Sequence, residues 1–134
     1  MARIKVIIPA FNEENSIGLV IKEIPSLVEE IIVVNNNSSD KTEEKAREAG
    51  ATVLLEERMG YGYACKKGVQ YVGKQSNPPD IVVFIDGDYS DYPEELPKVV
   101  DPILNNGMDL VIGARVKNLR EAGSMTPQQV FGNW

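Results

Sequence analysis

The feature that most constrains this chain is a regular alternation of short β-branched runs with longer amphipathic stretches. Apolar runs occupy residues 4–8, 31–34, 52–55, 81–85 and 109–112. Several of them are apolar on both faces, and a strand without a polar face must be covered on both sides, as in a parallel sheet. We therefore predict five strands, separated by helices over residues 16–28, 40–49, 61–73 and 93–106.

The ends of these predicted helices carry suitable residues. Asp40, followed three residues later by Glu43, predicts an N-cap with a capping-box partner, and Gly50 suits a C-cap. Pro93 fits the first turn of the last helix. Because crossovers between parallel strands are right-handed, the order β-α-β-α-β-α-β-α-β predicts an α/β fold. Its sheet is Rossmann-like, doubly wound and mostly parallel, with helices on both faces.

Composition excludes several classes of protein. A length of 134 residues suits one domain, and the 14 Lys and Arg against 20 Asp and Glu give a net charge of −6. The basic residues are scattered, so we expect no nucleic-acid partner. The chain has no histidine, which excludes Ser-His-Asp and Cys-His catalysis and His-ligated zinc.

The single cysteine and the lengths of the apolar runs indicate the cellular compartment of the protein. Cys65 cannot form an internal disulfide, so we expect a reducing cytoplasm, and we expect its side chain to be buried in a helix. No apolar run approaches the roughly 20 residues that span a bilayer, and residues 1–8 are too short for a signal peptide. Since the chain stops at Trp134, where a helix opens at Pro127, we expect a truncated domain.

Polar residues follow four of the five predicted strands. They are Pro9–Glu14, Asn35–Asp40, Asp86–Asp88 and Gly113–Arg115. In an open parallel sheet, ligands bind beyond the carboxyl ends of the strands, where the crossover direction reverses. We therefore expect one binding edge built from these four segments.

The sharpest of these segments is Asp86-Gly87-Asp88, directly after an apolar strand. Two carboxylates separated by a glycine, which allows close backbone approach, can hold a hard divalent cation that also binds a diphosphate. Such a metal would neutralise the charge on a departing nucleoside diphosphate. A tight turn or a calcium loop is the alternative for the same triplet.

Five segments in order carry a more specific resemblance. They are residues 6–14 (VIIPAFNEE), 32–42 (IVVNNNSSDKT), 60–64 (GYGYA), 86–88 (DGD) and 111–115 (VIGAR). The chain resembles the N-terminal part of an inverting family 2 glycosyltransferase with the GT-A fold, near the dolichyl- and polyprenyl-phosphate sugar transferases. The resemblance runs from Ile4 to Trp134 and makes Asp86–Asp88 the DXD motif.

The resemblance implies a function for the whole chain. Residues 1–134 would form a single nucleotide-sugar-binding domain, truncated on its acceptor-binding side. The enzyme would transfer a sugar from a nucleoside-diphosphate sugar to an acceptor with inversion. A phosphate acceptor such as polyprenyl phosphate, at the membrane surface, is already anionic and needs no general base. Any base and most acceptor contacts would then lie after Trp134.

The resemblance also implies roles for single residues. A divalent metal, Mn²⁺ or Mg²⁺, would be bound directly by Asp88, with Asp86 bridging metal and ribose or sugar. The other donor-binding residues would be Pro9, Ala10, Phe11, Glu13, Asn35, Asn36, Gly62, Gly87 and Arg115.

The Asn run departs from the family pattern, which usually has Asp at its first or second position. A carboxylate suits the two adjacent donors of guanine, whereas an amide offers one donor and one acceptor, as uracil does. If Asn35 or Asn36 reads the base edge, a UDP-sugar is favoured over a GDP-sugar. The alternative is that Asn36 and Asn37 are turn-formers that tolerate left-handed backbone.

Other residues in these segments also have structural alternatives. Pro9 could simply end its strand, and Glu14 could favour a helix N-terminus through the helix dipole. Ser38 and Asp40 fit caps better than ligands. Arg115 could pair with a phosphate, or with Asp86 or Asp88 as a structural bridge.

Three other interpretations compete for the whole chain. A haloacid-dehalogenase-type phosphotransferase also has a strand ending in Asp-x-Asp, but near its start, whereas here it is the fourth strand. A sugar nucleotidyltransferase needs a Gly-rich, Arg-containing loop after its first strand, and residues 9–14 are not such a loop. A nucleotide-sugar-binding module without transfer activity is the third.

Overall fold

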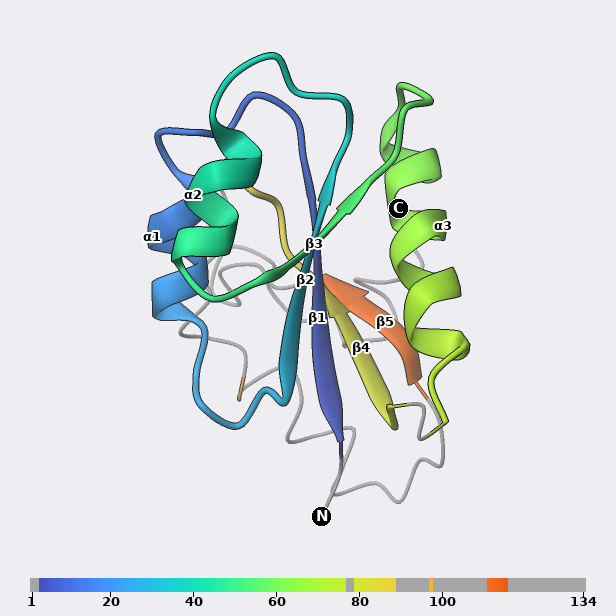
Figure 1. Cartoon of the computed structure of the whole chain (residues 1–134). Coiled ribbons are helices and arrows are strands. Elements are labelled where there is room, and N and C mark those ends of the chain that lie inside the picture. Colours follow the sequence, from blue (N-terminus) through green and yellow to red (C-terminus); the bar gives the residue numbers. More distant parts are fainter. Residues whose placement is uncertain (1–2, 77–78, 89–96, 98–110, 116–134) are drawn as a thin grey trace, which may run out of the picture.

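The sheet dominates the computed structural model, which describes residues 3–76, 79–88, 97 and 111–115. Its strands are Ile4–Ala10 (β1), Glu30–Asn35 (β2), Thr52–Leu55 (β3), Ile81–Phe84 (β4) and Val111–Arg115 (β5). Every pair of neighbours is parallel, and their order is β3-β2-β1-β4-β5 (Figure 1). The predicted α/β parallel sheet is therefore confirmed.

Helices cover both faces of this sheet within the described residues. The helices Ile17–Glu23 (α1) and Thr42–Glu48 (α2) lie on one face, and Tyr61–Gly73 (α3) lies on the other (Figure 1). Each face buries its own apolar cluster. The α1 side packs residues such as Ile8, Val20 and Val33, and the α3 side packs Ile7, Phe84 and Cys65. Cys65 is buried, as predicted.

Strand order places a switch point between β1 and β4. The chain runs outward from β1 to β2 and β3 and then returns to place β4 on the other side of β1. The register of β1 with β4 ends at Ile7 and Phe84, whereas its register with β2 continues to Ala10 and Asn35. The sheet therefore opens between the carboxyl ends of β1 and β4.

The opening between β1 and β4 explains how Pro9 fits within a central strand. The alternative from the sequence was that Pro9 ends its strand. Pro9 instead lies within β1 and pairs with Val34. A proline cannot donate to a ladder, and a central strand normally excludes it. Beyond Ile7, however, the described register of β1 continues only on the β2 side, so the missing N–H of Pro9 costs no ladder bond toward β4.

Other boundaries also differ from the sequence prediction, two of them by several residues. The first helix ends at Glu23 rather than at residue 28, because Ile24 precedes Pro25 and is extended at φ −72° and ψ 127°. The last strand extends through Arg115, so Gly113–Arg115 belong to β5 and do not follow it. Ala114 and Arg115 pair there with Val83 and Phe84. Except for Pro97, the predicted helix over 93–106, with Pro93, lies outside the described residues.

The caps of α2 are confirmed in part. The N–H of Gly50, at φ +99°, donates to the Arg47 carbonyl at 3.0 Å, and the N–H of Ala51 donates to that of Ala46 at 3.1 Å. This pattern is a Schellman C-cap. At the other end the N-cap position is Lys41, one residue after the predicted Asp40. Glu43 forms no capping box, because it pairs with Arg47 one turn later at 3.4 Å.

Candidate functional site

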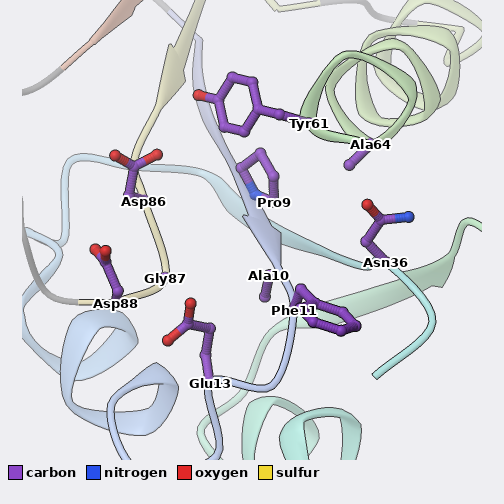
Figure 2. A pocket seen from close by; sticks show the side chains of 10 residues that line it. All are labelled: Pro9, Ala10, Phe11, Glu13, Asn36, Tyr61, Ala64, Asp86, Gly87 and Asp88. Carbon is purple, nitrogen blue, oxygen red and sulfur yellow. The ribbon is translucent and has the colours of Figure 1, made fainter. Parts of the chain in front are cut away.

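A pocket of about 410 Å³ opens at the switch point, where the carboxyl ends of β1 and β4 separate. Figure 2 shows acidic side chains on one side of it and Asn36 and Ala64 on the other. Its lining comes from four segments far apart in the sequence: Pro9, Ala10, Phe11, Glu13, Asn36, Tyr61, Ala64, Asp86, Gly87 and Asp88. Eight of these ten residues are among those singled out from the sequence.

The acidic triplet forms the β4 side of the pocket. Asp86 is half-buried and Asp88 is exposed, while Gly87 between them is buried. A Cβ atom on Gly87 would lie 3.3 Å from the Ala10 Cβ and 3.4 Å from the Glu13 Cγ. The Gly87 carbonyl accepts a hydrogen bond of 2.6 Å from the Ser16 hydroxyl. Glycine therefore lets the triplet approach β1 without displacing these neighbours, and the Ser16 bond fixes its backbone.

The pKa of the Glu13 carboxyl shows how negative charge accumulates in the pocket. Burial raises the pKa of the Glu13 carboxyl, and the negative charge of Asp88 raises it further. The Ser16 hydroxyl, 3.3 Å from Glu13 Oε2, acts in the opposite direction, and Asp40 and Asp86 add weaker repulsion. The pocket therefore concentrates negative potential, a field that favours a bound cation.

Asp86 and Asp88 fit a divalent cation of a particular kind. Within the described part of the chain, no three His, Cys, Asp or Glu side chains are grouped so that they could hold a metal ion. Mg²⁺ sites at phosphates, however, commonly use one or two carboxylates, with waters and phosphate oxygens completing the coordination. Two carboxylates beside a pocket match a cation that binds together with a diphosphate, rather than one held by protein alone.

The loops after β1 and β2 hold each other in place. The Asn12 N–H donates to the Ser38 hydroxyl at 2.9 Å, and the Glu14 N–H donates to Asp40 Oδ2 at 3.2 Å. Glu14 Oε2 in turn accepts from the Lys41 N–H at 3.2 Å, at the start of α2. Ser38 and Asp40 therefore have structural roles, and Glu14 lies at the N-terminus of α2 rather than of its own helix.

The three asparagines after β2 have three different environments. Asn35 is buried, and its Oδ1 accepts from the Ser38 N–H at 3.0 Å. Asn37 is exposed and left-handed at φ +61°, as a turn-former should be. Asn36 lines the pocket, and its Nδ2 donates to the carbonyls of Glu56 and Arg58 at 2.9 and 2.8 Å. Both amide donors of Asn36 are therefore engaged within the protein.

Two predicted residues, Asn35 and Gly62, lie away from the pocket lining, and the side chain of a third, Arg115, is not described. Asn35 lies beneath the loop, and Gly62 is on α3 but does not line the pocket. Arg115 is the last residue of β5 and pairs with Phe84, while its side chain lies outside what the structure describes.

Two lining residues, Tyr61 and Ala64, were not selected from the sequence. They occupy the first turn of α3 three positions apart, a spacing that places side chains on one helix face. The three-residue spacing is the sequence signal that could have identified them, because it places both residues, and not Gly62, on the helix face that lines the pocket.

Comparison with known proteins establishes the family. The fold and the pocket define an α/β domain with a pocket at the switch point of a parallel sheet. The model described as "Glycosyl transferase family 2" matches residues 5–134. The chain belongs to glycosyltransferase family 2, and its fold is of the GT-A type.

Named relatives support this assignment. The chain is 36% identical over 115 residues to a dolichyl-phosphate hexose transferase of Haloferax volcanii, covering 83% of this chain and 47% of the relative. It is 33% identical over 130 residues to glucosyl-3-phosphoglycerate synthase of Mycolicibacterium smegmatis, covering 90% and 43%. The chain spans about half the length of the curated relatives it matches.

Solved structures agree with the sequence relatives. Glucosyl-3-phosphoglycerate synthase of Mycobacterium tuberculosis, in complex with Mn²⁺, UDP and glucosyl-3-phosphoglycerate, matches with a TM-score of 0.66 and 35% identity. The match covers 77% of this chain and 40% of that one. The same enzyme with Mg²⁺ and UDP matches with a TM-score of 0.65. None of the helices described here is long and apolar enough to cross a membrane.

Proposed function

We propose that this chain is the donor-binding domain of a metal-dependent, inverting glycosyltransferase that takes its sugar from a nucleoside diphosphate. The observation that carries the proposal is the pair Asp86 and Asp88 at the switch-point pocket. Asp88 binds the metal directly, and Asp86 bridges the metal and the ribose or sugar. Mn²⁺ or Mg²⁺ supplies the positive charge that stabilises the departing diphosphate.

The remaining pocket residues bind the nucleoside. Pro9 and Ala10 are the last residues of β1 and Phe11 follows them, so together they line one wall of the pocket, against which a flat base can lie. Phe11 is 46% exposed and offers its ring for contact with the base. Glu13 lies between this wall and the triplet, where it reaches the ribose. The Arg115 side chain remains a candidate phosphate ligand, and Asn35 and Gly62 remain candidate donor contacts.

We further propose that the donor carries UDP rather than GDP. The M. tuberculosis synthase binds UDP, and it is 35% identical to this chain over the matched region. The sequence argument for UDP relied on an Asn amide that both donates to and accepts from the base. Both donors of the Asn36 amide already bond to the protein, so this side chain has no donor left for the base. One lone pair on its Oδ1 remains for a base donor.

The acceptor is a phosphate-bearing molecule, with polyprenyl phosphate the first candidate. The H. volcanii relative is named for a dolichyl-phosphate acceptor, whereas the synthase acts on phosphoglycerate. The attacking oxygen of a polyprenyl phosphate is already anionic and needs no general base, whereas a hydroxyl of phosphoglycerate must lose its proton to one. With a lipid acceptor, the enzyme acts at the cytoplasmic surface of the membrane. The alternative function is a nucleotide-sugar-binding module without transfer activity.

Isothermal titration calorimetry tests the donor site. UDP, GDP and the other nucleoside diphosphates are titrated with Mn²⁺ and again with excess chelator. We expect UDP to bind tightest with Mn²⁺ and much more weakly in chelator. Equal UDP affinity in both conditions would contradict the metal assignment, and tighter GDP binding would contradict the base assignment. Transfer from a UDP-sugar to polyprenyl phosphate by a full-length protein separates the enzyme from the binding module.

A further inference from the structure

We propose that Asn36 is the positioning residue of the pocket: its side-chain amide clamps residues 56–60 and so places the α3 wall opposite the β1 wall. This inference rests on the proposed nucleotide site and assigns Asn36 a role other than reading the base. Its evidence is a set of hydrogen bonds that uses almost the whole bonding capacity of one buried side chain.

The side chain of Asn36 is 5% exposed and bonds to three backbone groups of one segment. Its Nδ2 donates to the carbonyls of Glu56 at 2.9 Å and Arg58 at 2.8 Å, and its Oδ1 accepts from the Gly60 N–H at 3.0 Å. Only one amide orientation satisfies two carbonyls and one N–H, so the assignment of nitrogen and oxygen is fixed by the partners. The segment is thus held at three points by one residue.

The backbone of Asn36 connects this clamp to the opposite wall. Its N–H donates to the Ala10 carbonyl at 2.8 Å, at the end of β1. The clamped segment ends at Gly60, at φ +138°, and Tyr61 and Ala64 follow in the first turn of α3. Asn36 therefore lies between the two walls of the pocket and bonds to the backbone beneath each (Figure 2).

The outer side of the same segment is held differently. Arg58 pairs with the Glu56 carboxylate at 3.0 Å and lies over the Tyr63 ring at 4.5 Å from its centre. Arg58 and Tyr63 are exposed and the Glu56 carboxylate is buried, and their contacts tie the segment to itself and to α3. Within the described residues, three side-chain hydrogen bonds join the β2 loop to residues 56–60, and all three come from Asn36.

This bonding pattern requires an amide. A carboxylate of the same shape can only accept, so Asp at position 36 would face the carbonyls of Glu56 and Arg58 with no donor. Buried acceptors left unpaired in this way are costly, and the added charge repels both carbonyls. The clamp should open, and the α3 wall should lose its fixed position.

The test compares Asn36→Asp with Asn37→Asp, the same chemical change one residue away on an exposed turn. Backbone hydrogen exchange is followed in peptides covering residues 56–60 and, as a check on folding, residues 4–8. We expect exchange at 56–60 to rise about tenfold or more in Asn36→Asp, because at least one buried hydrogen bond is lost, and to stay unchanged in Asn37→Asp. If Asn36→Asp exposes residues 4–8 as well, Asn36→Ala makes the same comparison without added charge. Unchanged exchange at 56–60 in both Asn36 variants overturns the clamp.

Nucleotide binding separates positioning from base reading. With Mn²⁺, a positioning residue should weaken UDP and GDP binding by the same factor, about tenfold, so that their ratio is kept. A ratio that changes in Asn36→Ala assigns Asn36 to the base and overturns the proposal, as does unchanged affinity for both. If the unaltered chain binds neither nucleotide, the proposed function fails, while the exchange data still decide whether the clamp exists.

Discussion

Asp88 and Glu13 illustrate how single residues of this pocket depend on one another. The negative charge of Asp88 raises the pKa of the Glu13 carboxyl, so the two carboxylates repel each other in the absence of a cation. A divalent cation between them and a diphosphate would relieve that repulsion. The repulsion is thus a cost that metal binding would recover.

Asp88→Ala should abolish the metal dependence of nucleotide binding. The alanine removes the proposed direct ligand, and Asp88 is exposed, so the fold should be unaffected. With Mn²⁺ present we expect the UDP affinity to fall about tenfold or more, to the level measured in chelator. Calorimetric titration of the variant with and without Mn²⁺ measures this. Glu44→Ala, which removes an exposed carboxylate from α2, should bind UDP as the unaltered chain does. A variant at 88 that still responds to Mn²⁺ would assign the metal elsewhere.

At the scale of elements, the amino edge of the sheet is held by a polar network opposite the pocket. Lys5 on β1 is 4% exposed, and its Nζ lies 2.8 Å from Glu30 Oε1 on β2. Thr52 of β3 and Tyr71 of α3 donate to the other Glu30 oxygen at 2.9 and 2.8 Å. One carboxylate therefore joins three strands and a helix.

This network predicts how stability depends on pH. Burial would raise the pKa of Glu30, but hydrogen bonds from Lys5, Gln75, Tyr71 and Thr52 outweigh it and hold the pKa at about 2. A depressed carboxyl pKa stabilises the fold at neutral pH, and that stabilisation is lost as the pH falls from about 4.5 to about 2. The shift corresponds to about 3 kcal/mol, and solvent screening reduces the expected contribution to on the order of 1–2 kcal/mol.

Urea unfolding of Glu30→Gln at pH 7 and pH 3 measures that contribution. We expect the variant to be less stable than the unaltered chain at pH 7 and the difference to shrink at pH 3. Glu44→Gln, an exposed substitution, corrects for the other carboxylates and should show no such change with pH. A difference between Glu30→Gln and the unaltered chain that is the same at both pH values would mean that the carboxylate charge does not carry the network.

The contact of α3 with the sheet gives a second prediction for this scale. A Cβ on Gly68 would lie 2.6 Å from Cγ2 of Ile7, a fully buried residue of β1. Gly68→Ala should therefore destabilise the fold by about 1–3 kcal/mol through overpacking, despite its better helix propensity. Gly18→Ala in α1, where a Cβ meets nothing within 4 Å, should be neutral or stabilising by up to about 1 kcal/mol. Thermal or urea unfolding compares them, and equal effects at the two positions would refute the close α3 approach.

The elements also show what the sequence could and could not predict. The β-branched runs located every described strand to within a few residues, because both-face burial leaves a continuous apolar signal. The sequence prediction missed the early end of α1 before Pro25 and the continuation of β1 through Pro9. The first depends on how a proline restricts the residue before it, and the second depends on where the pairing of β1 with β4 stops. Hydrophobic periodicity records neither. Side-chain bonds such as those of Asn36 are not encoded in local pattern at all, since they join residues 20 or more positions apart.

At the scale of the whole molecule, the topology assembles the pocket. Residues from β1, the β2 loop, the first turn of α3 and the end of β4 meet because the order β3-β2-β1-β4-β5 places the switch point between β1 and β4. The position of the site follows from this order, and the sequence predicted a binding edge at the carboxyl ends of the strands but not the strand order itself. The strand order does not predict which residues form the α3 wall, because the course of residues 56–60 determines where Tyr61 lies.

The last prediction concerns what these 134 residues do alone. The chain spans about half the length of its curated relatives, while the described pocket already contains the acidic triplet and the nucleoside walls. We therefore expect the 134-residue chain to bind UDP with Mn²⁺ and to show little or no sugar transfer.

The comparison is made with a full-length family relative under the same conditions. Calorimetry should give UDP affinities within about tenfold of each other, because the donor contacts lie within the shared region. Release of UDP in the presence of UDP-sugar and polyprenyl phosphate should be confined to the relative. Robust transfer by the 134 residues would place the acceptor site within them. Absent UDP binding would mean that the donor site needs residues from the remainder of the relatives' length, since the triplet and the β1 wall would then be insufficient to hold a diphosphate.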